Sequence, residues 1–582
     1  MEKYGLMKRW MQKTYRIDIA KIAARYKISE ILAEVLVKRG LFDWTAMDQY
    51  LFADMESLHD PAEMKDLEKT AQLLEEKIAN RENIMIIGDY DVDGVMSTYI
   101  LYRGMQMLGG KAGFRIPHRV KDGYGIRDYM AQEAYEEGYT TILTCDNGIS
   151  AVDAIRKAKE LGMTVLLTDH HEVPCIDGKE VLPPADTIID PKQKECSYPF
   201  KELCGAGIAY KLITYMMQQR GKKCEQELLP YAAIATVCDV VPLLGENRIL
   251  VKNGLKYLEH TKDIGLKALL DIQQFQHRIT STDLGFRIGP CINAAGRLSD
   301  AKKAMDLLIE EEPKKAQKKA LELLELNQIR KDYTAMATRR AEEIIETSDI
   351  KNDKIYVVSL EDCHESVAGI VAGRIREKYY RPTLILTKAQ KGLKGSGRSI
   401  PEYHMQQGLL ASREFLTEFG GHALAAGFSL PEENLDALRK DLNQKCTLQE
   451  EDLIEKVYLD KDVMLEDMTE DLVKQLDWME PFGQNNPKAV FSKREVVVSA
   501  VALCGNENQI ARIRFKEGIR TYQGVDFRCE LHLAKAIRER YGEAAWESLM
   551  QKDGQEYAID ILFYPTINER FGGVQFEVLD CR

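Results

Sequence analysis

Carboxylate and imidazole side chains form three clusters in the first part of the chain, and each cluster follows a short apolar run. The clusters are Asp89-Tyr-Asp-Val-Asp-Gly94, Asp146 and Asp169-His-His171. Carboxylate and imidazole groups together favour Mn²⁺ or Mg²⁺ over a metal that prefers thiolates. The residue types therefore predict a metal site, provided that the clusters meet in the folded chain.

The apolar runs before the clusters have the composition of buried strands. They span residues 84–87, 141–144 and 163–168, and a helical stretch at 151–161 separates the last two. In an open parallel α/β sheet, the loops that follow the strands converge on one edge. We therefore expect the three clusters to meet at the strand ends of a parallel sheet.

Each cluster taken alone has a simpler interpretation. The first is similar to the start of an EF-hand loop, but Ile100 stands where that loop needs Glu, and a strand precedes it in place of a helix. Asp93 could instead cap a helix that starts near residue 94. Asp146 and the Asn-Gly that follows it could form only a strand-end turn. The joint occurrence of the clusters is what favours a metal site.

A further carboxylate, Asp239, lies within the apolar run 238–243. An unpaired charge buried in such a run is costly. A metal ion as partner removes that cost, so we add Asp239 to the predicted site.

Composition describes a chain of several domains. At 582 residues the chain is too long for one core, and about 150 residues per domain predicts three or four domains.

The net charge of −12 does not suggest a nucleic-acid partner, but residues 374–398 carry eight Lys/Arg against one acid, which allows a local basic face. The twelve cysteines form no CxxC pair, and we expect them to be reduced. Without a long apolar stretch or a signal-peptide pattern at its start, we expect the protein in the cytoplasm, away from membranes.

The order of motifs along the chain predicts five regions. Residues 1–80 are expected to be a helical extension, 81–300 a parallel-sheet α/β domain with all the metal ligands, and 301–350 a helical connector interrupted at Pro313. A second α/β domain at 351–450 carries glycine-rich turns at 395–399 and 420–422. Residues 451–582, with one helix near 530–547, are expected to form a small β-barrel.

Further motifs give the chain a family resemblance. They include Gly123-Tyr-Gly125, Gly205-Ala-Gly207, Asp239-Val-Val-Pro-Leu243, Gly289-Pro-Cys-Ile-Asn-Ala-Ala-Gly-Arg297, Gly420-Gly-His-Ala-Leu-Ala-Ala-Gly427 and Pro481-Phe-Gly-Gln-Asn-Asn-Pro487. With the Asp-His-His cluster, the chain resembles the DHH phosphoesterases, and within them the bacterial RecJ-type single-strand-specific exonucleases. This implies a DHH domain, a DHHA1-type substrate-binding domain and a C-terminal barrel of the OB type.

The resemblance also implies roles for particular residues. Two Mn²⁺ or Mg²⁺ ions would be held by Asp91, Asp93, Asp146, His170 and Asp239, with Asp89 in support. Asp146 would bridge the ions, and His171 would lie beside the scissile phosphate with Arg297 nearby. The implied substrate contacts in the second α/β domain are Arg398, Ser396, Ser399, Gly420, Gly421 and His422. Arg398 taken alone could instead be a solvated charge, although the substrate contact is the favoured interpretation.

Four positions depart from the pattern of the family. Ile87 stands where many relatives have His, Cys291 where Arg is frequent, Cys363 where Trp is common and Asn485 where Gly is common. We expect these changes to affect substrate contacts more than metal chemistry.

The resulting hypothesis is a single-stranded-DNA exonuclease that hydrolyses phosphodiester bonds from the 5′ end with two metal ions, in DNA repair and recombination. Single-stranded DNA is the expected partner of a monomeric enzyme, with a helicase and a single-strand-binding protein as candidates. The aromatic residues of the barrel could stack on bases or form its core: Trp478, Phe482, Phe515, Tyr522 and Phe527. The alternatives are a phosphodiesterase for short oligoribonucleotides or cyclic dinucleotides, and an inactive replication scaffold.

Overall fold

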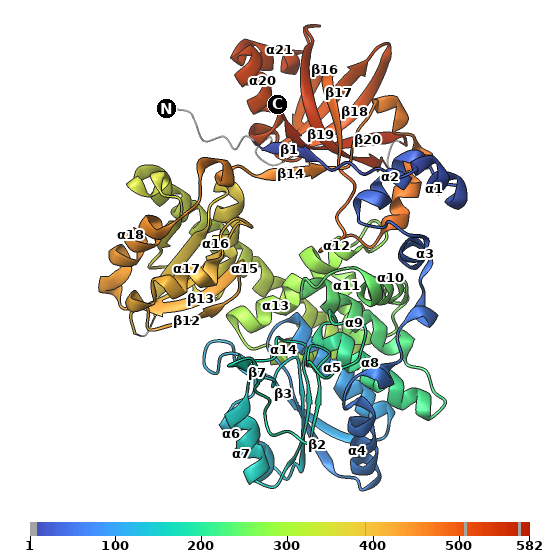
Figure 1. The fold of residues 1–582 in the computed structure, drawn as a ribbon, viewed down its shortest axis with the longest axis vertical. Coiled ribbons are helices and arrows are strands. Elements are labelled where there is room, and N and C mark those ends of the chain that lie inside the picture. Colours follow the sequence, from blue (N-terminus) through green and yellow to red (C-terminus); the bar gives the residue numbers. More distant parts are fainter. Residues whose placement is uncertain (1–7, 390, 506–508, 569–571) are drawn as a thin grey trace. The chain divides into compact units, whose positions relative to one another are not determined.

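The computed structural model describes residues 8–389, 391–505, 509–568 and 572–582. Two compact units divide the chain (Figure 1). The barrel unit comprises residues 1–52, 449–480 and 486–582, and the α/β unit comprises residues 53–448 and 481–485. Within the described ranges, no helix has the length and apolar composition needed to cross a membrane.

A five-stranded parallel sheet forms the first part of the α/β unit, in the order β3-β2-β4-β5-β8. The predicted runs correspond to β2 (Asn83–Ile87), β4 (Thr141–Cys145) and β5 (Thr164–Thr168). The other strands are β3 (Lys111–Arg115) and β8 (Thr187–Ile189). The expected parallel sheet is confirmed.

Helices cover both faces of this sheet because alternate strand residues point to opposite sides. Met85, Ile87 and Val165 pack against α6 (Asp128–Glu136) and α7 (Val152–Glu160). Ile84, Ile86 and Leu166 belong to the core that includes α5 (Val92–Met107) and α8 (Gly205–Gln219). With apolar residues on both faces, the strands appear in the sequence as continuous apolar runs.

A helical layer follows the sheet and leads into one long helix. Its members are α9 (Glu225–Cys238), α10 (Gly245–Leu258), α11 (Ile264–Asp271), α13 (Gly289–Leu298) and α14 (Lys302–Leu308). The connector helix α15 then spans Pro313–Thr347. Pro313 occupies the first turn of α15, where its missing N–H leaves no helical hydrogen bond unmade.

The second sheet has the order β12-β13-β11-β10-β9. Strands β9 (Tyr356–Ser359) and β10 (Thr383–Lys388) are parallel and flank α16 (Glu365–Tyr379). Strands β11 (Leu393–Arg398), β13 (Ala425–Leu430) and β12 (Glu418–Gly421) continue the sheet in antiparallel pairs. Helices α17 (Met405–Ala411) and α18 (Leu435–Lys445) complete this domain.

The prediction of a glycine-rich turn at 395–399 is wrong, because this segment forms most of β11 in the middle of the sheet. A Cβ atom on Gly395 would lie 2.2 Å from the ring of Phe428, and one on Gly397 would lie 3.0 Å from the sulfur of Met405. The glycines therefore make room for neighbouring side chains rather than bend the backbone. Gly420 and Gly421 end β12, and the φ angle of +145° at Gly421 suits the turn that follows.

The barrel unit contains a closed five-stranded barrel. Its strands are β16 (Phe491–Cys504), β17 (Ile510–Glu517), β18 (Arg520–Asp526), β20 (Val574–Cys581) and β19 (Tyr557–Ile567), and pairing of β16 with β19 closes it. Two helices, α20 (Leu533–Tyr541) and α21 (Glu543–Gln551), replace the single predicted helix. Gly542, with a φ angle of +87°, separates them because this conformation ends a helix.

Residues 1–80 do not form one helical extension. Strand β1 (Arg9–Gln12) pairs in parallel with β14 (Lys456–Leu459), and α1 (Ile19–Tyr26), α2 (Glu30–Lys38) and α3 (Trp44–Phe52) belong to the barrel unit. Helix α4 (Leu67–Ala79) belongs to the α/β unit and contacts β8. Pairing over more than 400 residues leaves no local signal, and this is why the sequence did not reveal it.

Arg39 offers a test of how the N-terminal segment contributes to the barrel unit. Its guanidinium lies 3.1 Å from the buried carboxylate of Asp460. We predict that Arg39→Met lowers the stability of the barrel unit by about 2 kcal/mol, because it leaves a buried charge without its partner. All four tryptophans belong to this unit, so tryptophan fluorescence during urea unfolding reports on it selectively. Arg16→Met, at an exposed position, is the control, and equal midpoints for the two variants would contradict the prediction.

Candidate metal centre

The predicted ligands converge at the carboxyl edge of the first sheet. Asp89 follows β2, Asp146 follows β4 and His170 follows β5, while Asp239 caps the C-terminus of α9. Ligand atoms lie within 4.8 Å of one another in three groups: Asp146-His170-His171, Asp93-His170-Asp239 and Asp89-Asp91-Asp146. The structure thus brings together all six predicted metal ligands.

His170 lies at the centre of these groups. Its Nε2 atom is 3.0 Å from Asp146 Oδ1, 3.5 Å from Asp93 Oδ2 and 3.7 Å from Asp239 Oδ2. Burial lowers the pKa of His170, which favours the neutral imidazole that binds metals. Three carboxylates and one neutral imidazole therefore face one point.

Backbone groups fix the first cluster. Asp91 caps α5 by accepting a hydrogen bond from Gly94 N at 3.0 Å, so the alternative in which Asp93 only caps this helix does not hold. Asp93 instead accepts from Gly205 N at 2.6 Å and Ala206 N at 2.8 Å, at the start of α8. A Cβ atom on Gly205 would lie 2.7 Å from Asp146 Cβ, which explains the glycine in this motif.

Electrostatic repulsion makes this carboxylate cluster unfavourable without a cation. Burial, and then the charges of neighbouring carboxylates, raise the pKa values of Asp89, Asp91, Asp146 and Asp239. Among the residues that the structure describes, the ion pairs of this cluster involve His170 alone. Divalent cations with oxygen and imidazole ligands satisfy such a cluster, so the donors fit Mn²⁺ or Mg²⁺.

The buried cysteines near the carboxylates do not change this assignment. Burial, and then the charge of Asp93, raise the pKa of the Cys204 thiol. Burial and nearby carboxylates raise that of Cys238 as well. Burial therefore disfavours in both cases the thiolate that metals bind.

Asp169 and Tyr124 belong to motifs in the sequence without a predicted role of their own, and the structure places both beside His171. Asp169 Oδ1 lies 2.8 Å from His171 Nδ1, and its Oδ2 accepts from Ile149 N at 2.9 Å. The Tyr124 hydroxyl donates to the carbonyl of Asp146 at 2.9 Å and lies 2.9 Å from His171 Nδ1. Burial opposes a charge on His171, but Asp169 outweighs it and raises the pKa of His171 to about 9.

Arginine side chains gather next to the carboxylates. Arg297 donates to the Ser366 carbonyl at 2.6 Å, and burial followed by repulsion from Arg119 and Arg330 lowers its pKa to about 9. Burial, and then Arg119, also lower the pKa of Arg398. Desolvated cations that repel one another form a site for an anion such as a phosphate.

The other predicted substrate contacts lie in the second sheet. The hydroxyl of Ser396 lies 3.3 Å from Arg398 Nη1. On the neighbouring strands, Ser396 is in register with Gly427 of β13, which in turn is in register with Gly420 of β12. A Cβ atom on either glycine would meet only open space. Gly421 follows in β12 and His422 in the turn after it, with its side chain exposed. Ser399 differs because its buried hydroxyl donates to the Tyr403 carbonyl at 2.7 Å.

The departures from the family pattern have structural explanations. Ile87 is fully buried in the core of the first sheet, so this position offers no ligand. Cys291 is buried and donates to the Arg287 carbonyl. Asn485 has a φ angle of +57°, a conformation that Asn tolerates where Gly is usual. Cys363 is buried beside His364.

Comparison with known proteins agrees with this architecture. Family models match for the N-terminal domain of the DHH family at residues 83–236, for the DHHA1 domain at 352–448 and for the RecJ OB domain at 459–580. These matches define the class as a DHH phosphoesterase with an OB domain.

Similar proteins narrow the class to one family. The single-stranded-DNA-specific exonuclease RecJ of Bacillus subtilis is 36% identical over 486 residues, 82% of this chain and 61% of that longer protein. RecJ of Haemophilus influenzae is 34% identical, over 78% of this chain and 82% of that protein. The crystal structure of Thermus thermophilus RecJ in complex with Mn²⁺ has a TM-score of 0.81 at 25% identity, covering 99% of this chain and 79% of that one. The chain belongs to the RecJ family of single-stranded-DNA-specific exonucleases.

Asp169→Asn tests how His171 is held. We predict that the pKa of His171 falls from about 9, because the charge and hydrogen bond that oppose burial are weakened, so that a larger fraction of His171 is neutral at pH 7. Catalytic rate should fall about 10- to 100-fold, as for other residues that orient a site. NMR titration of the histidines and single-turnover kinetics measure the two effects. Asp153→Asn, on the exposed face of α7, is the control, and an unchanged His171 pKa would refute this role.

Proposed function

We propose that the protein is a metal-dependent exonuclease that hydrolyses phosphodiester bonds of single-stranded DNA. The observation that carries this proposal is the carboxylate cluster around His170. In the described part of the chain, that imidazole alone forms ion pairs with the cluster. Buried carboxylates that repel one another are stable in a folded protein when a divalent cation supplies the compensating positive charge. The adjoining arginines supply a place for the phosphate.

Specific ligand roles follow from the three groups of donors. We assign Asp91, Asp93, Asp146, His170 and Asp239 as metal ligands, with Asp89 in support. Asp146 is the natural bridge because it belongs to two groups, one with His170 and one with Asp89 and Asp91. When bound, two divalent ions supply Lewis acidity toward the phosphoryl oxygens and toward the attacking water.

The chain's own side chains then position the substrate. His171, oriented by Asp169 and Tyr124, faces the same centre as Asp146 and serves beside the scissile phosphate. Arg297 and Arg398 neutralise phosphate charge at partly desolvated positions, where a charged hydrogen bond is strong. Since Arg297 is also bonded to Ser366, it joins the first α/β domain to the second at this point.

The barrel supports single-stranded DNA as the substrate. Arg512 and Arg514 are exposed on β17, and Trp478 and Phe527 expose 44% and 52% of their surfaces. Phe515, in contrast, is fully buried and belongs to the barrel core. A β-strand with exposed arginines and nearby exposed aromatic rings suits single-stranded DNA, because its phosphates are anionic and its bases are free to stack.

Several finer features belong to the proposal through the family resemblance. We propose digestion from the 5′ end, a role in DNA repair and recombination, a cytoplasmic location and a monomeric enzyme. A helicase that unwinds DNA and a single-strand-binding protein are the proposed partners. The barrel and the full ligand set argue against a short-oligonucleotide phosphodiesterase and an inactive scaffold, respectively.

Digestion of end-labelled strands tests the activity, the substrate and the polarity together. With Mn²⁺ or Mg²⁺, a 5′-labelled DNA strand should release its label as a mononucleotide at once, while a 3′-labelled strand shortens progressively. EDTA should abolish both, and Mn²⁺ should restore them. Persistent cleavage after full chelation would rule out the metal mechanism, and equal cleavage of RNA or blunt duplex would rule out the proposed substrate.

Asp146→Asn is the matched inactive variant for this assay. Asn keeps the size of the side chain and tolerates the φ angle of +59° at this position. It removes the charge that we assign to both ions, so turnover should vanish while strand binding remains. Binding by fluorescence anisotropy in EDTA separates the two, and normal turnover by a folded variant would remove Asp146 from the bridge.

Arg512→Gln with Arg514→Gln tests the barrel in the intact protein. We predict weaker capture of long strands, with the slope of log Kobs against log salt reduced by about 1.4, because each contact with a single-strand phosphate contributes about 0.7. Hydrolysis of a dinucleotide should change less. Lys535→Gln with Arg540→Gln in α20 is the control pair, and an unchanged salt slope in the β17 variant would exclude this strand from DNA binding.

A further inference from the structure

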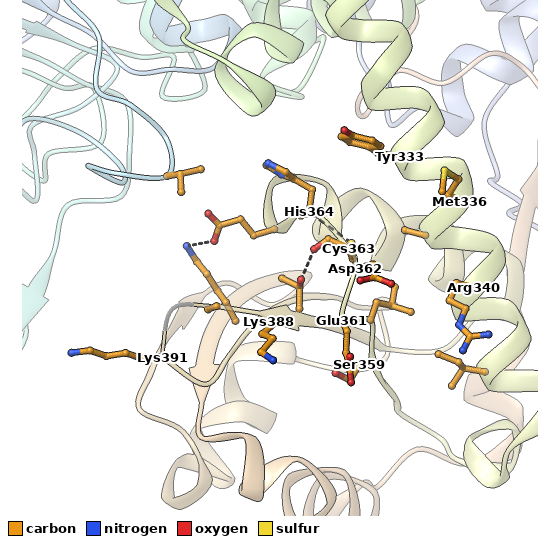
Figure 2. A pocket seen from close by; sticks show the side chains of 18 of the residues that line it. Tyr333, Met336, Arg340, Ser359, Glu361, Asp362, Cys363, His364, Lys388 and Lys391 are labelled. Carbon is orange, nitrogen blue, oxygen red and sulfur yellow. Dashed lines mark hydrogen bonds and ion pairs between the residues drawn. The ribbon is translucent and has the colours of Figure 1, made fainter.

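A cavity of 1560 Å³ opens at the carboxyl edge of the parallel strands β9 and β10 (Figure 2). Its walls are one face of α15, the segment 359–365 that leads into α16, the end of β10, and the loop after β3. Ligands of α/β sheets commonly bind at this edge. The metal ligands and the arginines described above do not line this cavity, so it needs its own explanation.

Two aromatic rings form one wall of the cavity. Figure 2 shows Tyr333, projecting from α15, next to His364 at the start of α16. The rings are inclined by only 15°, with centroids 6.5 Å apart, and Tyr333 is 46% exposed. Met336, one turn further along α15, is 69% exposed. The wall therefore offers flat, solvent-facing ring surfaces to a planar ligand.

The His364 ring is held in place before any ligand arrives. Its Nδ1 atom lies 2.7 Å from Ser366 Oγ, and the side chain caps α16. A ring that is already fixed loses little conformational entropy on stacking. Tyr333 stands on a continuous 35-residue helix, which fixes the position of its backbone.

Charge around the rings favours an anionic ligand. Lys121, Lys388 and Lys391 line the cavity with exposed side chains, and within the described ranges none has a carboxylate at ion-pair distance. Lys394 is held by Glu365 at 3.1 Å, and Arg340 by Glu343 at 2.6 Å. The lining acids that remain are on the segment 361–362. A planar group with phosphates nearby satisfies both the rings and the free lysines.

Short chains of residues and hydrogen bonds connect the cavity to the proposed phosphodiester site. Ser366, which fixes the His364 ring, also accepts a hydrogen bond from Arg297 through its carbonyl group. The loop that brings Lys121 to the cavity also carries Tyr124, which contacts His171. The rings are therefore linked through these contacts to residues of the proposed phosphodiester site.

We propose that Tyr333 and His364 form a stacking subsite for an unpaired nucleobase of the bound DNA strand, with the free lysines contacting the neighbouring phosphates. This inference rests on the proposed function and extends it. The subsite explains selection of single strands, since a base in a duplex has both faces covered by its neighbours. It also lets the enzyme bind the DNA strand whatever its nucleotide sequence, because every base has a face that can stack.

A double-mutant cycle between protein and DNA tests the stacking. Binding of a labelled strand to the intact protein is measured in EDTA, which prevents cleavage, for strands with an abasic site moved along the sequence. Tyr333→Ala should weaken binding of the normal strand about tenfold. With the abasic site at the stacking position, the wild-type protein should bind as weakly as the variant, and Tyr333→Ala should have no further effect.

Matched variants make the outcome decisive. Tyr333→Trp keeps a ring and should bind normally, and Tyr135→Ala, which removes a 50% exposed tyrosine from α6, should leave binding and activity unchanged. Equal affinity of Tyr333→Ala and the wild type, or the same loss at every abasic position, would overturn the subsite while leaving the nuclease proposal intact. Failure of the wild-type protein to bind single strands would overturn both.

Discussion

Repulsion among carboxylates at one edge of the first sheet is the constraint on which the α/β unit depends. Asp89, Asp91, Asp146 and Asp239 all have raised pKa values because burial and neighbouring charges oppose ionisation. The fold tolerates this cost through the start of α8, which donates two N–H groups to Asp93. A divalent cation offsets the rest, so the geometry that destabilises the metal-free protein is the geometry that binds metal.

An opposite cluster of charges lies next to the first. Arg119, Arg297 and Arg398 repel one another in a desolvated setting, as the lowered pKa values of Arg297 and Arg398 indicate. Cations of this kind are stabilised by an anion, as the carboxylates are by a metal. A phosphodiester with bound metal ions satisfies both clusters together. Binding of substrate and metal therefore relieves the repulsion within each cluster.

Glycines contribute to these sites by permitting close approach. Gly205 lets α8 begin against Asp146, and Gly94 lets α5 pack on the backbone of Asp89, where a Cβ atom would lie 2.4 Å from the carbonyl oxygen. Gly395 makes room for Phe428 inside a strand. In each case a neighbouring residue lies so close to the glycine that a side chain would not fit. These glycines are therefore explained by packing and not by flexibility of the backbone.

The sequence by itself determined the parallel sheet and the family, and it named the residues of the candidate metal site. These features depend on local signals, since apolar runs form strands with both faces covered and parallel strands bring their following loops to one edge. The tertiary structure decided the rest. Only the fold shows that Asp91 rather than Asp93 caps α5, that Asp169 and Tyr124 hold His171, and that 395–398 is a strand. It also assigns residues 8–52 to the barrel unit and brings Tyr333 next to His364. Apart from the cap by Asp91 and the contact of Asp169 with His171, which are local, these arrangements depend on contacts between distant residues, and such contacts leave no periodicity or spacing in the sequence.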